Sequence, residues 1–318
     1  MAPTPPGGSE RPGKPVALLD DARAERGPDM TTLDLSIPET PVPAGNRRLA
    51  RFVRRQPTFV LGVAVLVLVV IAGVLAPVWW TGEPMQMKPA QRLRPPSAER
   101  WFGSDHFGRD VYTRTLYGAR VSLVVGASVA VLSLALGTTL GLVIGFYRRL
   151  DTVMMRVMDG LMAIPAILLA LALMAMMRGS VRNVVIALVI PEIPRVIRLV
   201  RASVLSLREH TMVEAARALG VRTPRILLRY VLPALVAPLV VQATYICASA
   251  ILFEAYLSFL GAGTPPHIPS WGNIMAEGKT YVQLAFWIIL FPGLFLALTV
   301  LAINLVGDGL RDLLNVRG

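Results

Sequence analysis

The chain has 318 residues, of which 54% are hydrophobic and only 16% are charged. An ordinary soluble domain carries about 25% charged residues, so this composition excludes one and predicts that most of the chain lies in lipid. The net charge of +12 comes almost wholly from arginines beside long apolar runs, which is typical of the cytoplasmic faces of membrane proteins rather than of nucleic-acid binding. A single cysteine and three scattered histidines predict neither a disulfide framework nor a metal site.

Residues 1–45 predict a disordered cytoplasmic tail. They hold nine of the 25 prolines and no aromatic residue. Such a segment cannot bury enough apolar surface to offset the entropy lost on ordering. It also lacks the basic and apolar regions of a secretory signal peptide. A true beginning nearer Met30 is an alternative for this segment.

Long charge-free stretches predict the membrane-spanning helices of the remaining domain, 46–318. A spanning helix needs about 20 apolar residues, and five stretches approach or exceed that length. A sixth is interrupted by Glu192 and Arg195, which stand three residues apart. They either form an ion pair near the membrane surface or line a translocation path. The six predicted spans are about 57–80, 121–147, 160–177, 183–199, 231–253 and 281–306.

Arginine distribution sets the predicted orientation. Six spans put both termini on one side, and the arginine-rich loop 195–230 lies on that same side, which is therefore cytoplasmic. The first external loop, about 81–120, holds seven bases and four acids and does not fit the rule. Its charge pattern predicts a local network of Asp105, Arg109 and Asp110, which would serve as a periplasmic docking surface or as a structural brace.

Glycine spacing in the second predicted span indicates close helix packing. Gly137, Gly141 and Gly145 recur at every fourth position, which lets another helix approach closely. In the same external loop, Gly103 and Gly108 predict tight turns.

The cytoplasmic loop, about 200–230, has a predicted structure of its own. Thr211 and Glu214 have the spacing of a capping box, in which the threonine oxygen accepts from the Glu214 backbone N–H. A short helix should follow and end at Gly220. A second helix should begin at Thr223 and lead into the fifth span. The short helix should have one apolar face, formed by Met212, Val213, Ala216 and Leu219. This face would dock into a partner protein or lie on the lipid surface.

This loop resembles the EAA signature of binding-protein-dependent ABC importer permeases. Glu214-Ala215-Ala216 precedes Gly220 at the spacing of that signature, although Tyr230 stands where the family usually has isoleucine. In that family the loop forms a coupling helix that sits in a cleft of the ATPase subunit. The resemblance thus implies that coupling to the ATPase falls on Thr211, Glu214, Ala215, Ala216, Arg217 and Gly220.

Three further stretches narrow the resemblance to the C-type permease of the dipeptide, oligopeptide and nickel subfamily. Together they extend the similarity over roughly residues 50–315. It implies an all-α membrane protein with six transmembrane helices, a type I ABC importer permease fold and a short cytoplasmic coupling helix. The stretches are Trp101 to Asp110 with its continuation to Leu123, Ser258 to Gly272, and Asn304 to Asp312.

The resemblance also implies the partners and the location. The protein would lie in lipid in the bacterial cytoplasmic (inner) membrane, with a sister permease as heterodimer and two ATPase subunits that bind ATP and Mg. A periplasmic or lipid-anchored solute-binding protein would deliver the solute. Dipeptides, oligopeptides, glutathione, nickel chelates and opine-like compounds all remain open as solutes.

No catalytic residues are expected in the chain itself. The stretch from Gly272 to Thr280 comes near a phosphate-binding loop, but it has five residues between its glycines where that loop has four. Two alternatives to an ABC permease stay open. One is a secondary transporter driven by an ion gradient, with Glu192 as its buried acid, and the other is a membrane scaffold without transport activity.

Overall fold

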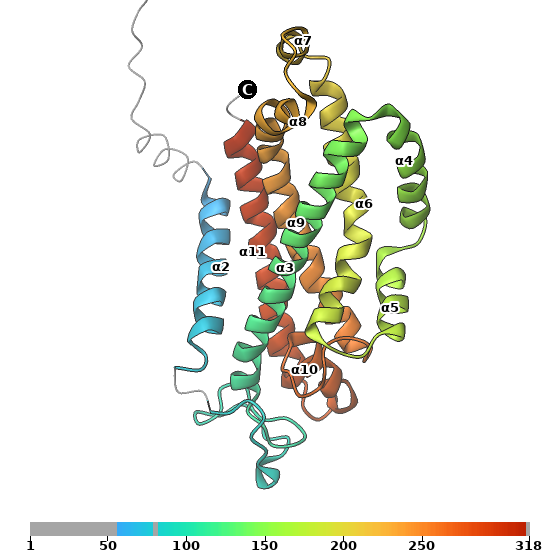
Figure 1. The fold of residues 1–318 in the computed structure, drawn as a ribbon. Helices are drawn as coiled ribbons and strands as arrows, with labels where there is room; N and C mark the ends of the chain where they lie inside the picture. Colours follow the sequence, from blue (N-terminus) through green and yellow to red (C-terminus); the bar gives the residue numbers. More distant parts are fainter. Residues whose placement is uncertain (1–55, 79–81, 316–318) are drawn as a thin grey trace, which may run out of the picture. The chain divides into compact units, whose positions relative to one another are not determined.

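A computed structural model describes residues 56–78 and 82–315, and every regular element within them is a helix. The predicted all-α class is confirmed. The long helices (Figure 1) are α2 (Pro57–Leu75), α3 (Val111–Phe146), α6 (Val181–Leu207), α9 (Leu232–Phe259) and α11 (Trp287–Asn315). The short elements are η2 (Pro89–Gln91), α4 (Arg148–Met162), α5 (Ala166–Met176), α7 (Thr211–Ala218), α8 (Thr223–Ile226), the π-helical turn η3 (Leu227–Val231), α10 (Trp271–Gly278) and η4 (Lys279–Tyr281).

Four helical stretches among the described residues are long and apolar enough to cross a membrane, and a fifth is added if α4 and α5 count as one span. The helix α6 is not among them, because Glu192, Arg195 and Arg198 lie near its middle. The predicted number of six spans therefore stays a prediction. The four stretches are Pro57–Leu75, Val111–Phe146, Thr223–Phe259 and Trp287–Leu314.

The predicted span over 160–177 contains a sharp break. Its helix ends at Met162, resumes at Ala166, and bends by 84° between α4 and α5. Proline disfavours a helical conformation at the residue before it, so Pro165 explains a break at this position. The apolar run that suggested one helix is thus divided between two.

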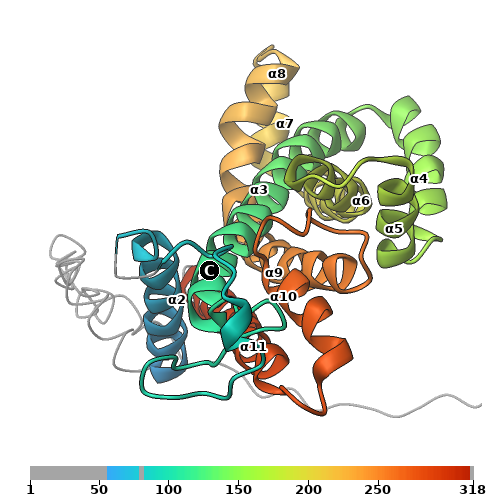
Figure 2. The same ribbon diagram turned by 90° about the horizontal axis from the view of Figure 1, so that it is seen from below.

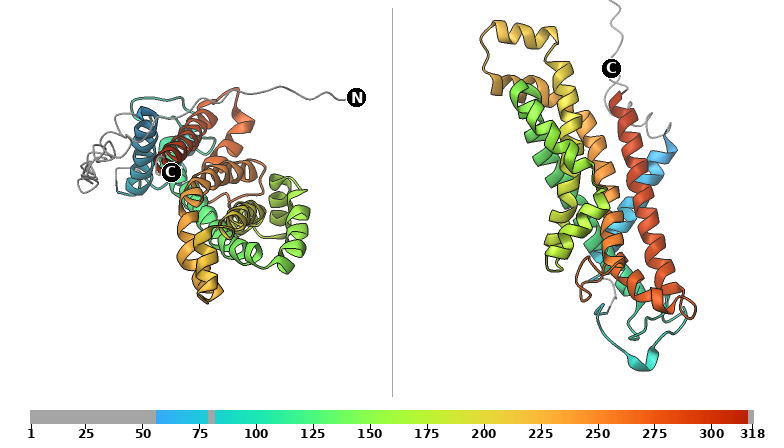
Figure 3. Two further views of the ribbon diagram at one scale, coloured as in Figure 1. Left: turned by 90° about the horizontal axis from the view of Figure 1, so that it is seen from above. Right: turned by 90° about the vertical axis from the view of Figure 1, so that its right-hand side faces the viewer.

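Helix α3 is the centre of the helical bundle. It packs on α2, α6, α9 and α11, while α6 lies between α3 and the α4–α5 pair (Figure 2). Two ion pairs join α4 to α6: Arg198 binds Asp159 at 2.8 Å, and Arg201 binds Asp151. At one end of the bundle lies α7, and at the other lie α10 and the loop 82–110 (Figures 1 and 3). We call these the α7 end and the α10 end.

Glycines of α3 meet valines of α6 in a regular series. A Cβ placed on Gly137 would lie only 2.5 Å from Val196 Cβ, so no larger residue fits there without displacement. The same contact recurs one and two turns along both helices, which confirms the predicted close packing. The pairs are Gly137–Val196, Gly141–Val200 and Gly145–Val204, at 2.5, 2.8 and 2.9 Å. We call this contact the α3–α6 seam.

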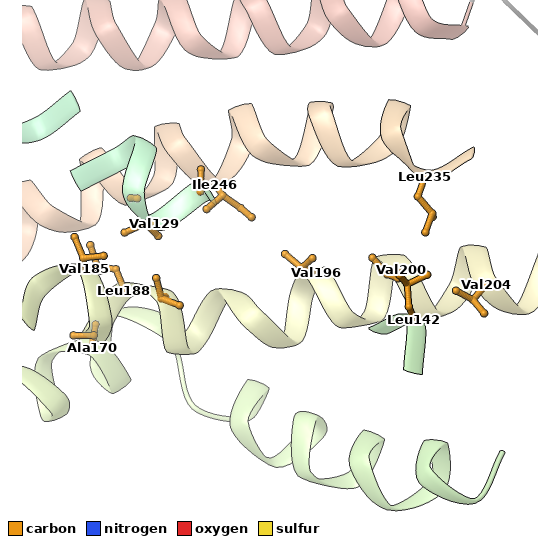
Figure 4. Close-up of a cluster of buried hydrophobic side chains, with 14 of the residues drawn as sticks. Val129, Leu142, Ala170, Val185, Leu188, Val196, Val200, Val204, Leu235 and Ile246 are labelled. Carbon is orange, nitrogen blue, oxygen red and sulfur yellow. The ribbon is translucent and has the colours of Figure 1, made fainter. Parts of the chain in front are cut away.

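The largest hydrophobic core surrounds this seam. Figure 4 shows its buried side chains converging from α3, α5, α6 and α9. The core also includes Val213 and Ala216 of α7 together with Ile226 and Leu227. The short helix at the α7 end is therefore packed onto the same core as the long helices.

Candidate functional site

The first candidate site is α7 with the turns that flank it. Its N-cap is His210, whose backbone carbonyl accepts from the backbone N–H groups of Val213 and Glu214 at 2.8 and 3.2 Å. Thr211 is the first helical residue, and the N-cap makes no side-chain hydrogen bond to the helix. The predicted capping box is therefore wrong, because the helix begins one residue earlier than the threonine spacing suggested.

The end of α7 agrees with the prediction. Gly220 has a φ of +75°, a left-handed conformation that glycine adopts without a Cβ penalty. Its N–H donates to Arg217 O at 2.9 Å, and Val221 N–H donates to Ala216 O at 3.0 Å. These two bonds form a Schellman motif, and Val221 packs on the core. The turn at Gly220 thus fixes the direction in which the chain leaves α7.

The two faces of α7 have different environments. Val213 and Ala216 are buried in the core, whereas the side chains of Met212 and Leu219 are 55% and 83% exposed. The predicted apolar face is therefore divided between two environments. At about 100° per residue its four positions fall within an arc of about 120°, with 212 and 219 toward one edge and 213 at the other. Val213 and Ala216 hold α7 to the bundle, while Met212 and Leu219 are two large apolar side chains left uncovered in this chain.

A cation–π contact also joins α7 to α3. The guanidinium carbon of Arg217 lies 4.9 Å from the ring centroid of Phe146, the last residue of α3. Of the other predicted coupling residues, Thr211, Glu214 and Ala215 are exposed. No local pattern in the sequence indicated Phe146, because this contact joins residues far apart along the chain.

A second candidate site is an ion-pair cluster at the α10 end. Asp105 is bound by Arg109 at 2.6 Å and by Arg114 at 2.7 Å. Glu277 of α10 binds Arg114 at 2.7 Å and also pairs with Arg109. The side chains of Asp105 and Arg114 are fully buried. We call Asp105, Arg109, Arg114 and Glu277 the ion-pair cluster.

The predicted local network is only partly correct. Asp105 and Arg109 do pair, but Asp110 is the N-cap of α3, where its Oδ2 accepts from Thr113 N–H at 2.8 Å. Prediction missed Arg114 and Glu277, because Glu277 comes from a distant helix. Since the cluster is largely buried, its geometry favours the brace over the docking surface.

Two tryptophan side chains hold the α10 end together. The Trp287 indole N–H donates to Ser104 O of the loop 82–110 at 3.2 Å, and the Trp271 indole N–H joins α10 to α3 by donating to Thr115 O at 2.9 Å. Gly103 and Gly108 have φ values of +71° and +76°, which confirms the predicted turns. The α10 end is thus a tightly packed cap.

His106 lies beside the ion-pair cluster. Its ring stacks on Tyr281 with centroids 5.1 Å apart. Burial lowers the pKa of His106 below its ordinary value of 6.5, against the opposing effect of Asp105. Asp105, His106 and Glu277 offer ligand atoms within 4.8 Å of one another, yet two arginines already neutralise both carboxylates. This donor set suits ion pairs better than a metal.

The remaining sequence candidates lie in helices. Arg195 binds Glu192 at 2.9 Å, which confirms the predicted pair. The Glu192 side chain is 2% exposed, whereas that of Arg195 is 34% exposed. The stretch from Gly272 to Thr280 forms α10 and the start of η4, so it is not a phosphate-binding loop.

Comparison with known proteins adds independent information. Residues 137–317 match the family described as binding-protein-dependent transport system inner membrane component. A transport system permease protein of Brucella suis is 51% identical over 84% of this chain and 90% of its own length. The dipeptide transport system permease protein DppC of Alkalihalophilus pseudofirmus is 40% identical over 85% and 89%. The oligopeptide transport system permease protein OppC of Bacillus subtilis is 35% identical over 82% and 86%.

A solved structure shares the fold. The MetNI methionine ABC transporter, in an inward facing conformation, contains a chain that superposes with a TM-score of 0.51 at 19% identity. The superposition covers 62% of this chain and 94% of that one.

Proposed function

Because this chain belongs to the family of binding-protein-dependent transport system inner membrane components, we propose that it is the permease subunit of an ABC importer for peptides or related small solutes. The relatives named for dipeptide and oligopeptide transport support this solute class. The chain provides part of a translocation path and is not an enzyme. ATP and Mg are bound, and ATP is hydrolysed, by partner ATPase subunits.

The observation that carries this proposal is the arrangement of α7. Val213 and Ala216 fix the helix to the core, while the adjacent Met212 and Leu219 are exposed. Large apolar side chains on a short projecting helix suit insertion into a groove of a partner protein. We assign that groove to an ATPase subunit, with Thr211, Glu214 and Ala215 at the contact.

The working complex contains this chain, a sister permease as heterodimeric partner, two ATPase subunits and a periplasmic or lipid-anchored solute-binding protein. The α7 end faces the cytoplasm together with both termini, and the α10 end faces outward. The binding protein delivers the solute to a path between the two permeases. ATP binding brings the ATPase subunits together, and this movement displaces α7.

Displacement of α7 reaches the long helices by two routes. One is the core contact of Val213 and Ala216, and the other is Arg217 on Phe146 at the end of α3. The α3–α6 seam then passes the movement to α6. Because packed helix interfaces rearrange between discrete states rather than deforming continuously, this suits alternating access.

Purification of the tagged chain from its native membrane tests the assembly. We expect it to bring down a second permease and two ATPase subunits. In proteoliposomes with the binding protein, uptake of a labelled dipeptide should require ATP and persist with an uncoupler present. Uptake that an uncoupler abolishes while ATP is held constant would contradict the proposal and favour an ion-gradient transporter.

A further inference from the structure

The α3–α6 seam has a register that extends beyond its three glycine–valine pairs. Each valine lies 59 positions after its glycine, and both helices advance by four residues from pair to pair. One step toward the α10 end, the same register places Ser133 of α3 opposite Glu192 of α6. A further step pairs Val129 with Leu188, and both are buried in the core (Figure 4).

Ser133 and Glu192 are thus a single polar pair within an apolar seam. The Ser133 side chain is fully buried, and its Oγ has no hydrogen-bond partner among the described residues. Glu192 is 2% exposed; its Oε1 accepts from Arg195, and its Oε2 has no partner in the same part of the chain. Buried polar atoms are nearly always hydrogen-bonded, because an unpaired one loses its interaction with water without replacement. Each of these two atoms supplies what the other lacks, since a hydroxyl donates and a carboxylate accepts.

We propose that Ser133 and Glu192 form a hydrogen-bonded rung across the seam, with the Ser133 hydroxyl donating to Glu192 Oε2 directly or through one water molecule, and that this rung makes α3 and α6 move as one unit during transport. Arg195 supports the rung from the other side by holding Oε1 at 2.9 Å. Glu192 is then a positioning residue. It would keep the two helices in register near the middle of α6, where the glycine–valine pairs end.

The rung does not depend on the identity of the solute or of the partners. Its consequence for coupling rests on the proposed function, because α7 is joined to α3 through Arg217 and Phe146. A rigid α3–α6 unit would carry that displacement toward the α10 end. A loose unit would let α3 slide on α6, and ATP would be hydrolysed without uptake.

The neighbouring pairs provide the design of the test. Ser133→Gly and Glu192→Val each remove one side of the rung, and the double variant copies the Gly137–Val196 pair one turn away. Each single variant in the assembled complex should lower the thermal unfolding midpoint by about 2 °C or more. The double variant should lose less than the sum of the two single losses, because neither side of the rung is then left without its partner. All four proteins contain Arg195, and it loses its carboxylate partner in both variants that carry Glu192→Val. This loss therefore cancels when the effect of Ser133→Gly is compared with and without Glu192→Val.

A matched control separates the rung from a general effect of Glu192. Thr139 is on α3 but is exposed, and its hydroxyl donates to its own helix at Ala135 O. Thr139→Ala combined with Glu192→Val should therefore give additive losses. Glu192→Gln, which retains a hydrogen-bonding side chain, should stay close to the wild-type midpoint. Additive losses for Ser133→Gly and Glu192→Val would overturn the rung.

Transport supplies a readout that a purely structural pair would not change. We expect the number of dipeptides imported per ATP hydrolysed to fall several-fold in each single variant and to recover in the double variant and in Glu192→Gln. An unchanged ratio in the single variants would overturn the coupling role. Absence of ATP-dependent uptake in the wild-type complex would instead contradict the proposed function. A structure that resolves ordered water distinguishes a direct bond from a bridged one.

Discussion

Gly220 is the residue whose backbone most directly constrains the coupling helix. Its φ of +75° permits the Schellman motif that ends α7, and its N–H donates to Arg217 O. Apart from its chain neighbours, no described residue has a heavy atom within 4 Å of the position that a Cβ would take, so conformation rather than space selects glycine. Proline satisfies neither requirement, since it fixes φ near −65° and has no N–H.

We therefore expect Gly220→Pro to leave membrane insertion intact but to uncouple ATP hydrolysis from uptake. The local cost of forcing this turn is ~1–3 kcal/mol, enough to displace a short surface helix. The measurement is dipeptide uptake and ATPase rate in the same proteoliposomes. Gly220→Asn is the control, because asparagine tolerates the left-handed conformation, and it should retain most uptake. Normal uptake by Gly220→Pro would argue against the role of the turn.

His106 makes the stability of the α10 end depend on pH. Burial lowers its pKa below 6.5, so the unfolded chain binds a proton more readily than the folded one. The free energy of unfolding should therefore be highest above about pH 6.5 and should fall as the pH drops below that value. The thermal midpoint of wild type and His106→Gln, followed from about pH 7.5 to 5.5, checks this. The wild type should lose more than the variant; equal slopes would exclude a contribution from His106.

Residue-level prediction from the sequence succeeded where the signal was local. The glycine at 220, the turns at Gly103 and Gly108, and the Glu192–Arg195 pair depend on neighbours within a few positions. It failed where partners are distant. Asp105 is bound by Arg114 as well as by Arg109, and Arg114 also binds Glu277 of α10. A local sequence pattern cannot predict a partner on another helix.

The α3–α6 seam is the main contact between elements. Gly141 is typical: a Cβ on it would lie 2.8 Å from Val200 Cβ, closer than real Cβ atoms come. Gly160 of α4 is a matched helical glycine: outside its own helix, no heavy atom in the described part of the chain lies within 4 Å of its Cβ position. Alanine raises helix propensity at both positions but meets a neighbouring helix only at Gly141, so comparing the two substitutions separates helix propensity from packing.

Gly141→Ala should destabilise the protein, because overpacking a fitted contact costs ~1–3 kcal/mol. Gly160→Ala should be neutral or stabilising by up to ~1 kcal/mol, since alanine favours the helix. Thermal unfolding of both variants in the same lipid or detergent provides the comparison. Equal effects at the two positions would show that the seam is not a close contact.

Helices were predicted well where their apolar composition identifies them, and poorly where backbone geometry sets their ends and bends. The apolar runs marked α2, α3, α9 and α11, and the GxxxG spacing marked the seam. The bend at Pro165 and the π-helical turn η3 are local backbone geometry, which hydropathy does not report. The capping box at Thr211 failed because the helix takes its first hydrogen bonds from the His210 carbonyl instead.

At the scale of the whole molecule, the two ends of the bundle are built differently. The α10 end is closed by the buried ion-pair cluster and by two tryptophans bonded to backbone carbonyls. The α7 end carries a short helix with exposed apolar side chains that contacts both the core and α3. In the proposed complex the first is a rigid cap and the second receives mechanical work from the ATPase subunits.

The contact between α7 and an ATPase subunit is therefore the central claim, and site-directed cross-linking tests it most directly. Cysteine is placed at Met212 or Leu219, which are exposed, or as a control at the buried Val213, in a background with Cys247→Ser. In the assembled and transport-competent complex, the first two positions should cross-link to an ATPase subunit, and the control should not. Cross-links from Met212 and Leu219 to the solute-binding protein, or none at all in a complex that still imports its solute, would contradict the account.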